Sequence, residues 1–243
     1  MTDRASIARR ALGLLDLTDL SDSCSVAEVE TLCGRAATPH GAVAAICVWP
    51  RFVSTAKAAL GPSKVRIATV VNFPSGDEGI DEVVRETRRA IDDGADEIDV
   101  VLPYRSMLAG DEERARSMLT AVRHAAPAPV LVKVILETGE LPDSATIAKC
   151  ARLAISCGAD FIKTSTGKTA VSATTAAVDV MLDVIAHSGR RVGIKPSGGI
   201  RTLDDAATYL ASADRIMGTQ WVDASTFRFG ASGLLDAILK ELS

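Results

Sequence analysis

The sequence has 243 residues, of which 47% are hydrophobic and 24% charged, with a formal net charge of -4 and a pI near 5.5. This length and composition predict a folded globular protein, either one large barrel or two small domains. The acidic balance argues against binding to nucleic acid or to an anionic membrane surface. No apolar run approaches the roughly 18 residues of a membrane span, so we expect a cytoplasmic protein with small-molecule partners.

Cysteine and histidine residues give little sign of a disulfide framework or a metal site. None of the cysteines has CxxC spacing, and their odd number favours reduced thiols. The histidines are scattered, without HxH or HExxH pairs, so a metal site would have to consist mostly of carboxylates. We therefore expect no metal site. The residues concerned are Cys24, Cys33, Cys47, Cys150, Cys157, His40, His124 and His187.

Short apolar runs rich in Val, Ile and Leu recur along the chain and alternate with amphipathic stretches. Such runs are typical of buried parallel strands, and many of the stretches between them end at glycine, as helices often do. An initial helix is predicted at residues 4–15. The eight predicted strands lie at residues 14–18, 44–50, 65–74, 97–103, 130–136, 161–165, 192–199 and 215–220. Predicted helices between them include residues 79–95, 111–126, 143–159 and 172–189.

The regular alternation of strand and helix predicts the α/β fold class. No linker, low-complexity tract or change in composition divides residues 1–243. We therefore predict a single (β/α)8 TIM barrel with an extra N-terminal helix, forming one domain over residues 1–243. The alternative is an open doubly wound sheet, because a strand count based on pattern alone can be wrong by about one or two strands.

Four consecutive predicted strands each contain one ionisable residue. These are Asp99 in EIDVVLP, Lys133 in VLVKVIL, Lys163 in FIKTS and Lys195 in VGIKPSGG. Alternate residues of a barrel strand point into the interior, so we expect the four side chains to face one another. A lone strand lysine could simply snorkel to the surface, but burying three amines beside one carboxylate is costly. The pattern favours a catalytic group, with a structural ion-pair network as the alternative.

A crowded lysine suits imine chemistry. A neutral amine attacks a carbonyl, and an adjacent cation such as Lys195 would lower the pKa of Lys163 and so supply that neutral amine. Once protonated, the Schiff base acts as an electron sink, so that a bond beside the former carbonyl can break. Asp99 would move protons to or from the hydroxyl of the adduct, directly or through water. These residues predict aldolase chemistry.

Three glycine-rich turns point to a phosphorylated substrate. They lie at residues 165–168, 196–201 and 228–233, at the ends of the sixth, seventh and eighth predicted strands. Their backbone N–H groups could bind an anion, and Lys168 adds positive charge. The last turn also opens a helix, whose N-terminus favours phosphate. One such turn is often only a tight connection, but three at consecutive strand ends predict a sugar phosphate as substrate.

Segments along nearly the whole chain resemble the deoxyribose-phosphate aldolases, class I aldolases of nucleoside catabolism. The most specific are FIKTSTG and KPSGGIR, which distinguish this family from other Schiff-base barrels. The family order is also kept by DLTDL, AAICVWPRF, NFPSG, EIDVVLPYR, KVILETGEL and RFGAS. The resemblance implies a lyase that reversibly cleaves 2-deoxy-D-ribose 5-phosphate to acetaldehyde and D-glyceraldehyde 3-phosphate. It places the reaction in deoxyribonucleotide catabolism and carbohydrate degradation, and it implies no metal or organic cofactor.

The resemblance also assigns roles residue by residue. It implies that Lys163 forms the Schiff base, that Lys195 is the cation that tunes it, and that Asp99 is the proton-transfer carboxylate. Gly233 stands where some relatives have a second serine, which would remove one hydroxyl donor to phosphate. The implied phosphate contacts are Gly167, Lys168, Gly198, Gly199, Gly230 and Ser232.

Three further residues are expected near the site. Lys133 resembles a member of the charge network behind it. Asp16 resembles a family residue at the base of the site, although an acidic residue at a strand end could instead bind its own loop. Cys47 lies near the expected rim, but a buried intracellular cysteine is usually a small hydrophobe, so we assign it no catalytic role.

Two other functions remain open. A Schiff-base aldolase for a different phosphosugar would keep Lys163 but accept another donor. A noncatalytic phosphosugar-binding barrel would bind ligand without forming an imine, and the intact set of Lys163, Lys195 and Asp99 argues against it. In each case the expected partner is a small phosphosugar, with no nucleic acid and no membrane. The expected assembly is a homodimer.

Overall fold

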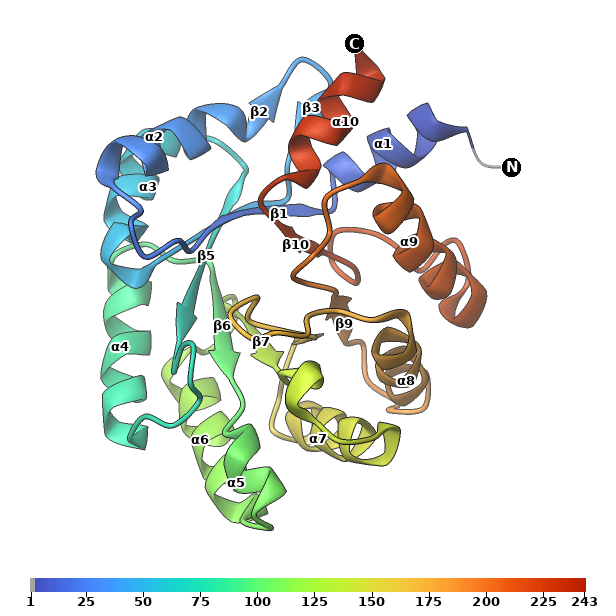
Figure 1. The fold of residues 1–243 in the computed structure, drawn as a ribbon. Coiled ribbons are helices and arrows are strands. Elements are labelled where there is room, and N and C mark those ends of the chain that lie inside the picture. The colour runs from blue at the N-terminus through green and yellow to red at the C-terminus, as the bar shows by residue number, and fades with distance from the viewer. Residues whose placement is uncertain (1–2) are drawn as a thin grey trace.

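The computed structural model describes residues 3–243, in which parallel strands surround a common centre and helices cover their outer side (Figure 1). The barrel strands are β1 (Leu15–Asp19), β4 (Ala45–Val48), β5 (Arg66–Val71), β6 (Glu97–Val101), β7 (Leu131–Ile135), β8 (Phe161–Lys163), β9 (Gly193–Lys195) and β10 (Phe229–Ala231). They pair in chain order from β1 to β9, and β10 pairs with β1. Bridges from Ile194 to Phe227 and from Ser197 to Gly230 complete the ring. The predicted (β/α)8 barrel is confirmed.

Helices follow the strands as the sequence predicts. The initial helix is α1 (Arg4–Leu12), and the helices predicted from residue 79 onward are α4 (Ile80–Asp92), α6 (Glu112–Ala125), α7 (Ser144–Ser156) and α8 (Thr175–Ala186). The later helices are α9 (Leu203–Met217) and α10 (Leu234–Leu242). The shorter elements are α2 (Val26–Arg35), α3 (Val53–Leu60), α5 (Tyr104–Leu108), the 3-10 helices η1 (Pro50–Phe52) and η2 (Thr138–Glu140), and the hairpin β2 (Ala37–Thr38) and β3 (Gly41–Ala42).

Local sequence signals fix where several of these helices begin. Asp143 caps α7 by accepting a hydrogen bond from the backbone N–H of Thr146. Thr202 and Asp205 form a reciprocal capping box at the start of α9. Each cap satisfies backbone donors that have no partner inside the helix. The caps therefore hold the connections from β7 to α7 and from β9 to α9 in defined positions at the C-terminal end of the barrel.

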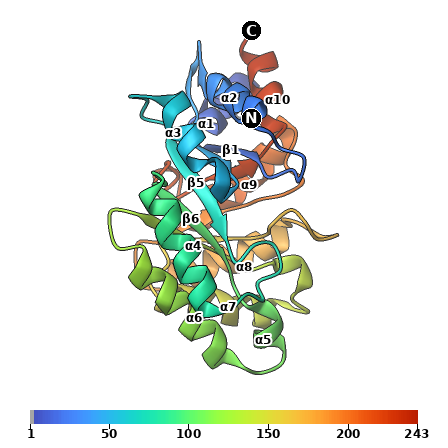
Figure 2. The same ribbon diagram turned by 90° about the vertical axis from the view of Figure 1, so that its left-hand side faces the viewer.

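The strands separate an ionic interior from an apolar outer layer. In β6 the buried residues Glu97 and Asp99 pair with charged side chains inside the barrel, so Ile98 and Val100, at the alternate positions, face the surrounding helices. The helices cover this layer with apolar faces, and α4 and α6 lie side by side along the outside (Figure 2). Burial of these faces is the main source of stability for a barrel of this kind. It also offsets the cost of placing charges inside.

The position of the eighth strand was predicted wrongly. Residues 215–220 are the end of α9 and the turn after it, and the eighth barrel strand is β10 at Phe229–Ala231. The apolar residues Ile216 and Met217 belong to the last turn of an amphipathic helix, which ends before Gly218. The true strand is only three residues long and contains a glycine, so its local strand signal is weak.

None of the helices in the described part of the chain is long and apolar enough to cross a membrane.

Candidate active site

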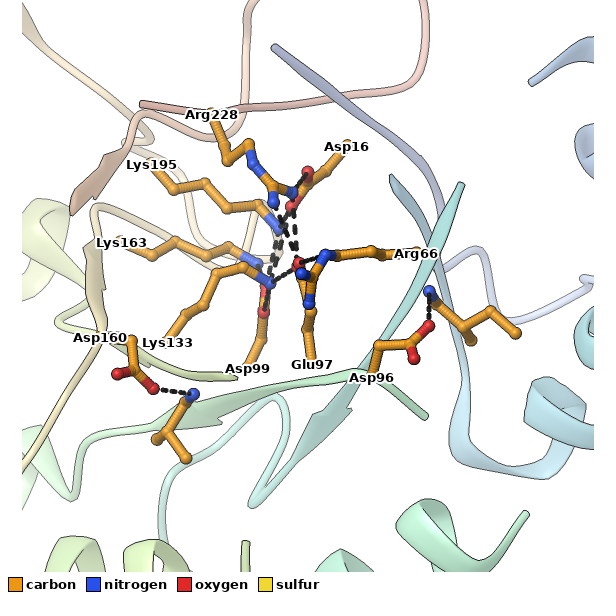
Figure 3. A network of polar contacts seen from close by, with 12 residues as sticks. Asp16, Arg66, Asp96, Glu97, Asp99, Lys133, Asp160, Lys163, Lys195 and Arg228 are labelled. Carbon is orange, nitrogen blue, oxygen red and sulfur yellow. Dashed lines mark hydrogen bonds and ion pairs between the residues drawn. The ribbon is translucent and has the colours of Figure 1, made fainter. Parts of the chain in front are cut away.

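The interior of the barrel holds a cluster of ionisable side chains that are almost completely buried (Figure 3). All are on barrel strands except one, which directly precedes β10. Strand pairing sets their heights, since Lys133 lies beside Asp99 in the register of β6 and β7, and Lys163 lies beside Lys195 in that of β8 and β9. The members are Asp16 on β1, Glu97 and Asp99 on β6, Lys133 on β7, Lys163 on β8, Lys195 on β9 and Arg228.

Asp99 is the centre of the cluster, and the structure brings the three predicted lysines together on it. Its Oδ1 atom accepts a hydrogen bond from Lys133 Nζ at 2.7 Å. Its Oδ2 atom accepts from Lys163 Nζ at 3.0 Å and from Lys195 Nζ at 2.8 Å. The lysine side chains extend from neighbouring strands toward this one carboxylate (Figure 3). Ion pairs of this kind stabilise a buried network only when each charge is hydrogen-bonded, as these are.

A second layer of ion pairs lies behind Asp99. Asp16 Oδ2 is 2.6 Å from Lys195 Nζ, and Asp16 Oδ1 accepts from Arg228 at 2.6 Å. Glu97 pairs with Lys133 at 2.6 Å and with Arg228 at 3.0 Å. Asp16 therefore lies at the base of the site, and the alternative in which its carboxylate binds its own loop is wrong. The backbone carbonyl of Asp16 accepts a hydrogen bond from the hydroxyl of Thr18, which lies on the same strand.

Glu97 and Arg228 were missed at the level of the sequence, although the strand period identifies both. Glu97 is two residues before Asp99 on β6, so the two side chains point to the same side of the strand. Arg228 is two residues before Gly230 and likewise points inward. The misplaced eighth strand hid the second case. Charged residues at alternate positions of an apolar strand were the signal that could have found them.

The environment moves the pKa values of the two neighbouring lysines in opposite directions. Burial lowers the pKa of Lys163, and the positive charge on Lys195 adds to that effect against the opposing pull of Asp99. Burial also disfavours the charged form of Lys195, but Asp16 and Asp99 outweigh it and raise the pKa of Lys195. Lys195 therefore holds its proton more tightly than Lys163 does.

The charges of the cluster lead to the same assignment. It contains the cationic side chains of Lys133, Lys163, Lys195 and Arg228 but only three carboxylates. A buried excess charge is unfavourable, and the group with the weakest hold on its proton is the one that loses it. With Lys163 neutral, the three buried cations Lys133, Lys195 and Arg228 face three carboxylates, and the half-exposed Arg66 lies at the edge of the cluster, 3.7 Å from Glu97. Burial raises the pKa of the Asp99 carboxyl, but the three lysines outweigh this effect and hold that pKa well below its usual value.

A cavity of about 340 Å³ opens at the C-terminal ends of β1, β8, β9 and β10. Its lining comes from the four loops that follow these strands, at residues 18–21, 166–168, 197–201 and 230–233. It includes every residue that the sequence assigns to phosphate binding: Gly167, Lys168, Gly198, Gly199, Gly230 and Ser232. The three glycine-rich turns are far apart in sequence, and the barrel brings them to one place.

The cavity is lined by backbone donors that the protein does not use. Within residues 3–243, the N–H groups of Gly167, Gly199, Ser232 and Gly233 donate to no other group. Ser232 and Gly233 also precede the first turn of α10, where the helix dipole favours an anion. Such converging N–H groups form a concave site suited to phosphate oxygens. Gly233, in place of a serine, still contributes its backbone donor.

Two of the glycines are required by close packing at the base of the cavity. A Cβ atom on Gly230 would lie 2.8 Å from Ser197 Oγ and 3.0 Å from Lys195 Cε. Gly198 has a φ of +85°, and a Cβ there would lie 2.5 Å from Ser172 Oγ. Gly230 therefore lets the cavity wall approach the Lys195 side chain. The glycine-rich loops that line the cavity and the lysine cluster are in direct contact through this glycine.

Lys168 lies at the edge of the cavity and has a partner in this structure. Its Nζ atom is 3.0 Å from Asp22 Oδ1 and 5.8 Å from the centre of the Trp49 ring. The Asp22 side chain is 90% exposed, so this ion pair is weak and can be exchanged for another anion.

Cys47 is fully buried on β4, and burial raises the pKa of its thiol. A protonated thiol is a poor nucleophile, so the geometry assigns Cys47 a packing role. Within residues 3–243, no group of three or more His, Cys, Asp or Glu side chains is placed to hold a metal ion.

Comparison with known proteins identifies the family. Residues 10–240 match the DeoC/LacD family of aldolases. The chain belongs to this family. It is also 57% identical over 237 residues to the deoxyribose-phosphate aldolase of Agrobacterium fabrum, an alignment that covers 97% of this chain and 92% of the relative.

Solved structures of other family members share the fold. A candidate deoxyribose-phosphate aldolase of Toxoplasma gondii has a TM-score of 0.89 and 29% identity, covering 98% of this chain and 96% of that one. The deoxyribose phosphate aldolase of Aeropyrum pernix, a tetramer, has a TM-score of 0.78 and 25% identity, covering 100% of this chain and 94% of that one. The family resemblance predicted from the sequence motifs is confirmed.

Proposed function

We propose that this protein is a class I aldolase that reversibly cleaves 2-deoxy-D-ribose 5-phosphate to acetaldehyde and D-glyceraldehyde 3-phosphate through a Schiff base on Lys163. The observation that carries the proposal is the environment of this amine. It is only 2% exposed, its pKa is lowered by burial, and it lies three residues before Thr166, which lines the phosphate cavity. Membership of the aldolase family supports the same reaction.

The reaction begins when neutral Lys163 Nζ attacks the C1 aldehyde of the open-chain sugar. The carbinolamine loses water and leaves a protonated imine, which withdraws electrons from the neighbouring carbons. Formation of this cation next to Lys195 would be unfavourable without a counter-ion. Asp99 Oδ2, 3.0 Å from Lys163 Nζ, supplies the negative charge that stabilises it.

The C2–C3 bond then breaks as the C3 hydroxyl loses its proton. The C3 oxygen becomes the carbonyl oxygen of D-glyceraldehyde 3-phosphate, and the electron pair of the broken bond enters an enamine that retains C1 and C2. Protonation of C2 and hydrolysis of the imine release acetaldehyde and restore the amine. We assign these proton transfers to Asp99, acting directly or through a water molecule.

The cavity holds the 5-phosphate during these steps. We assign it to the N–H groups of Gly167, Gly199, Ser232 and Gly233 and to the Lys168 ammonium group. Gly198 and Gly230 provide the space that allows this approach. Binding energy from the remote phosphate group fixes the sugar chain with its C1 end at Lys163, which lowers the entropic cost of the reaction.

The assembly and cellular setting are extensions of this proposal. A homodimer stays a prediction, and the relative from Aeropyrum pernix is a tetramer. We place the reaction in the cytoplasm, in deoxyribonucleotide catabolism and carbohydrate degradation.

A coupled assay tests the proposed substrate. Cleavage of 2-deoxy-D-ribose 5-phosphate should release equal amounts of acetaldehyde and D-glyceraldehyde 3-phosphate, each detected with its own dehydrogenase. A donor screen in the synthetic direction should favour acetaldehyde over ketone donors when D-glyceraldehyde 3-phosphate is the acceptor. Preference for a ketone donor would assign the protein to another phosphosugar. Binding of the substrate without turnover would instead indicate a noncatalytic barrel.

A further inference from the structure

Glu137 is a buried carboxylate that the proposed reaction does not use. It follows β7 by two residues, its side chain is fully buried, and within residues 3–243 it forms no ion pair. Its backbone is in the left-handed region, with a φ of +56°, which is rare for a residue other than glycine. Both features are unfavourable on their own, and such features gather at functional sites.

All partners of the Glu137 carboxylate belong to the loop that follows β8. The Thr166 N–H group lies 3.2 and 3.3 Å from its two oxygens, and the Thr166 hydroxyl donates to Oε2 at 2.5 Å. The Thr169 hydroxyl lies 3.3 Å from Oε1 and 3.2 Å from the Val171 carbonyl oxygen, so these two acceptors share its proton. Hydrogen bonds to an ionised acceptor are stronger than neutral ones. The carboxylate therefore holds the segment that contains Gly167 and Lys168 firmly at Thr166 and more weakly at Thr169.

These contacts determine which N–H group of the loop remains available. The Thr166 N–H is taken by Glu137, and the Thr166 hydroxyl, while donating to Glu137, accepts from the Lys168 N–H at 3.0 Å. Gly167 lies between them with a φ of +79°, and its own N–H has no partner in the described residues. The loop is therefore fixed with the Gly167 donor left over for a ligand in the cavity.

The turn after β7 and the loop after β8 also pack closely at a second point. Gly139, two residues after Glu137, packs so closely on the loop that a Cβ atom there would lie 2.1 Å from the carbonyl oxygen of Val171. The turn after β7 and residues 166–171 thus touch at both a polar and a steric point. Because β7 itself is in the barrel wall, the turn transmits the rigidity of the barrel to the phosphate loop.

We propose that Glu137 is a positioning residue for phosphate recognition. It holds the Thr166–Lys168 segment in the conformation that presents the Gly167 N–H and the Lys168 side chain to the substrate's 5-phosphate group. The inference rests on the proposed function, because it concerns the same phosphate site. Glu137 has no part in imine formation, since its contacts end at the loop and do not reach the lysine cluster.

The test compares Glu137→Ala and Glu137→Gln with Glu140→Ala, a control that removes an exposed carboxylate from the same turn. For Glu137→Ala the KM for 2-deoxy-D-ribose 5-phosphate should rise about tenfold or more, the equivalent of one lost charge-assisted hydrogen bond, with kcat changed far less. Glu137→Gln retains one acceptor oxygen and the side-chain volume, so its KM should lie between those of wild type and Glu137→Ala. Glu140→Ala should match wild type.

Two further measurements separate positioning from general structural damage. Cleavage of unphosphorylated 2-deoxy-D-ribose and borohydride trapping of acetaldehyde do not need the phosphate loop, so both rates should stay within about twofold of wild type. Equal losses with both sugars, or an unchanged KM in Glu137→Gln and Glu137→Ala, would overturn the proposal. The wild-type protein distinguishes the positioning role of Glu137 from the proposed aldolase function. If the wild-type protein did not cleave the phosphorylated sugar, the proposed function itself would be rejected.

Inorganic phosphate provides a probe that does not depend on turnover. It should compete with the phosphorylated sugar in wild type and in Glu140→Ala, and its inhibition constant should rise in both Glu137 variants. Unchanged inhibition by phosphate would contradict the positioning role even if the enzyme acts on another phosphosugar.

Discussion

Lys163 and Lys195 donate hydrogen bonds to the same oxygen atom, Oδ2 of Asp99, at 3.0 and 2.8 Å. Lys195 has a second carboxylate, Asp16, at 2.6 Å, whereas Lys163 has none among the described residues. This difference gives two chemically identical side chains different affinities for a proton. The lysine with two carboxylates holds its proton, and the lysine with one shared carboxylate releases it more readily.

Loss of the Lys195 charge should make imine formation require higher pH. The positive charge lowers the pKa of Lys163, so Lys195→Leu should raise that pKa and leave less neutral amine at pH 7. We expect the acid limb of single-turnover imine formation to move toward alkaline pH, with partial recovery of the rate near pH 10. Lys163→Leu, the control, should show no rate at any pH because it lacks the nucleophile. An unshifted limb in Lys195→Leu would rule out the tuning role.

Removal of the Asp99 carboxylate should separate imine formation from bond cleavage. Asp99 opposes the lowering of the Lys163 pKa, so Asp99→Asn should leave that amine neutral. Trapping of acetaldehyde should still occur, but more slowly than in wild type, because the protonated imine has lost its counter-ion. Cleavage should fall by about 10²–10⁴-fold, the usual contribution of a positioned proton-transfer group. Single-turnover trapping and steady-state kcat, measured on the same preparation, provide the comparison. If cleavage fell no more than trapping did, Asp99 would not be the proton-transfer group.

The ionic layer behind the site should control resistance to acid. Although burial opposes it, Lys195 and Arg228 hold the pKa of Asp16 below its ordinary value. A depressed carboxylate pKa stabilises the fold above the unfolded-state pKa of about 3.9, and this contribution is lost as pH falls below it. Arg228→Met should raise the Asp16 pKa toward its unfolded value, so less of this stabilisation is present at neutral pH and the acid-unfolding midpoint moves upward.

Circular dichroism during titration from pH 7 to 2 would measure this shift, and urea unfolding at pH 7 should show a loss of about 3–5 kcal/mol for the broken buried pair. Arg191→Met is the matched control, because the Arg191 side chain is 73% exposed and its ion pair with Asp223 spans 3.9 Å. An Arg228→Met protein with the wild-type midpoint would show that the layer does not set the stability of the fold.

A negative charge at Ser232 should weaken recognition of the phosphate group. Ser232→Glu places a carboxylate beside the free N–H groups before α10, where it would repel the substrate's dianion. We expect most of the preference for phosphorylated over unphosphorylated deoxyribose to be lost, as a ratio of kcat/KM values. Ser144→Glu adds the same charge at the start of α7, outside the lining of the cavity, and should leave that ratio unchanged. A preserved preference in Ser232→Glu would place the phosphate elsewhere.

The sequence predicted the barrel well because its signal is repeated. Apolar runs alternate with amphipathic stretches along the chain, so an error in one element does not alter the fold class. The eighth strand shows the limit of this reasoning, since the three-residue β10 has less local signal than the apolar end of α9. Its position is fixed by backbone pairing to β1 and to the segment around β9, which only the closed ring provides.

The candidate site was predictable where the chemistry is unusual. Lysines in apolar strands stand out, so Lys163 and Lys195 could be identified from their neighbours in the sequence. Glu97 was overlooked although it lies two residues before Asp99 on the same strand, and Arg228 was overlooked because the eighth strand was misplaced. The contacts of Glu137 could not be predicted either, since they depend on a left-handed backbone conformation that the local sequence does not indicate.

The central claim is that Lys163 alone forms the covalent intermediate, and reductive trapping tests it most directly. Acetaldehyde and borohydride should add two carbons to one lysine, and peptide mass spectrometry should locate them on Lys163 with loss of all turnover. Lys163→Leu should give neither label nor activity, while Lys168→Leu should still be labelled at Lys163. A label on Lys195, Lys133 or Lys168 in the wild-type protein, or full activity without any label, would contradict the account.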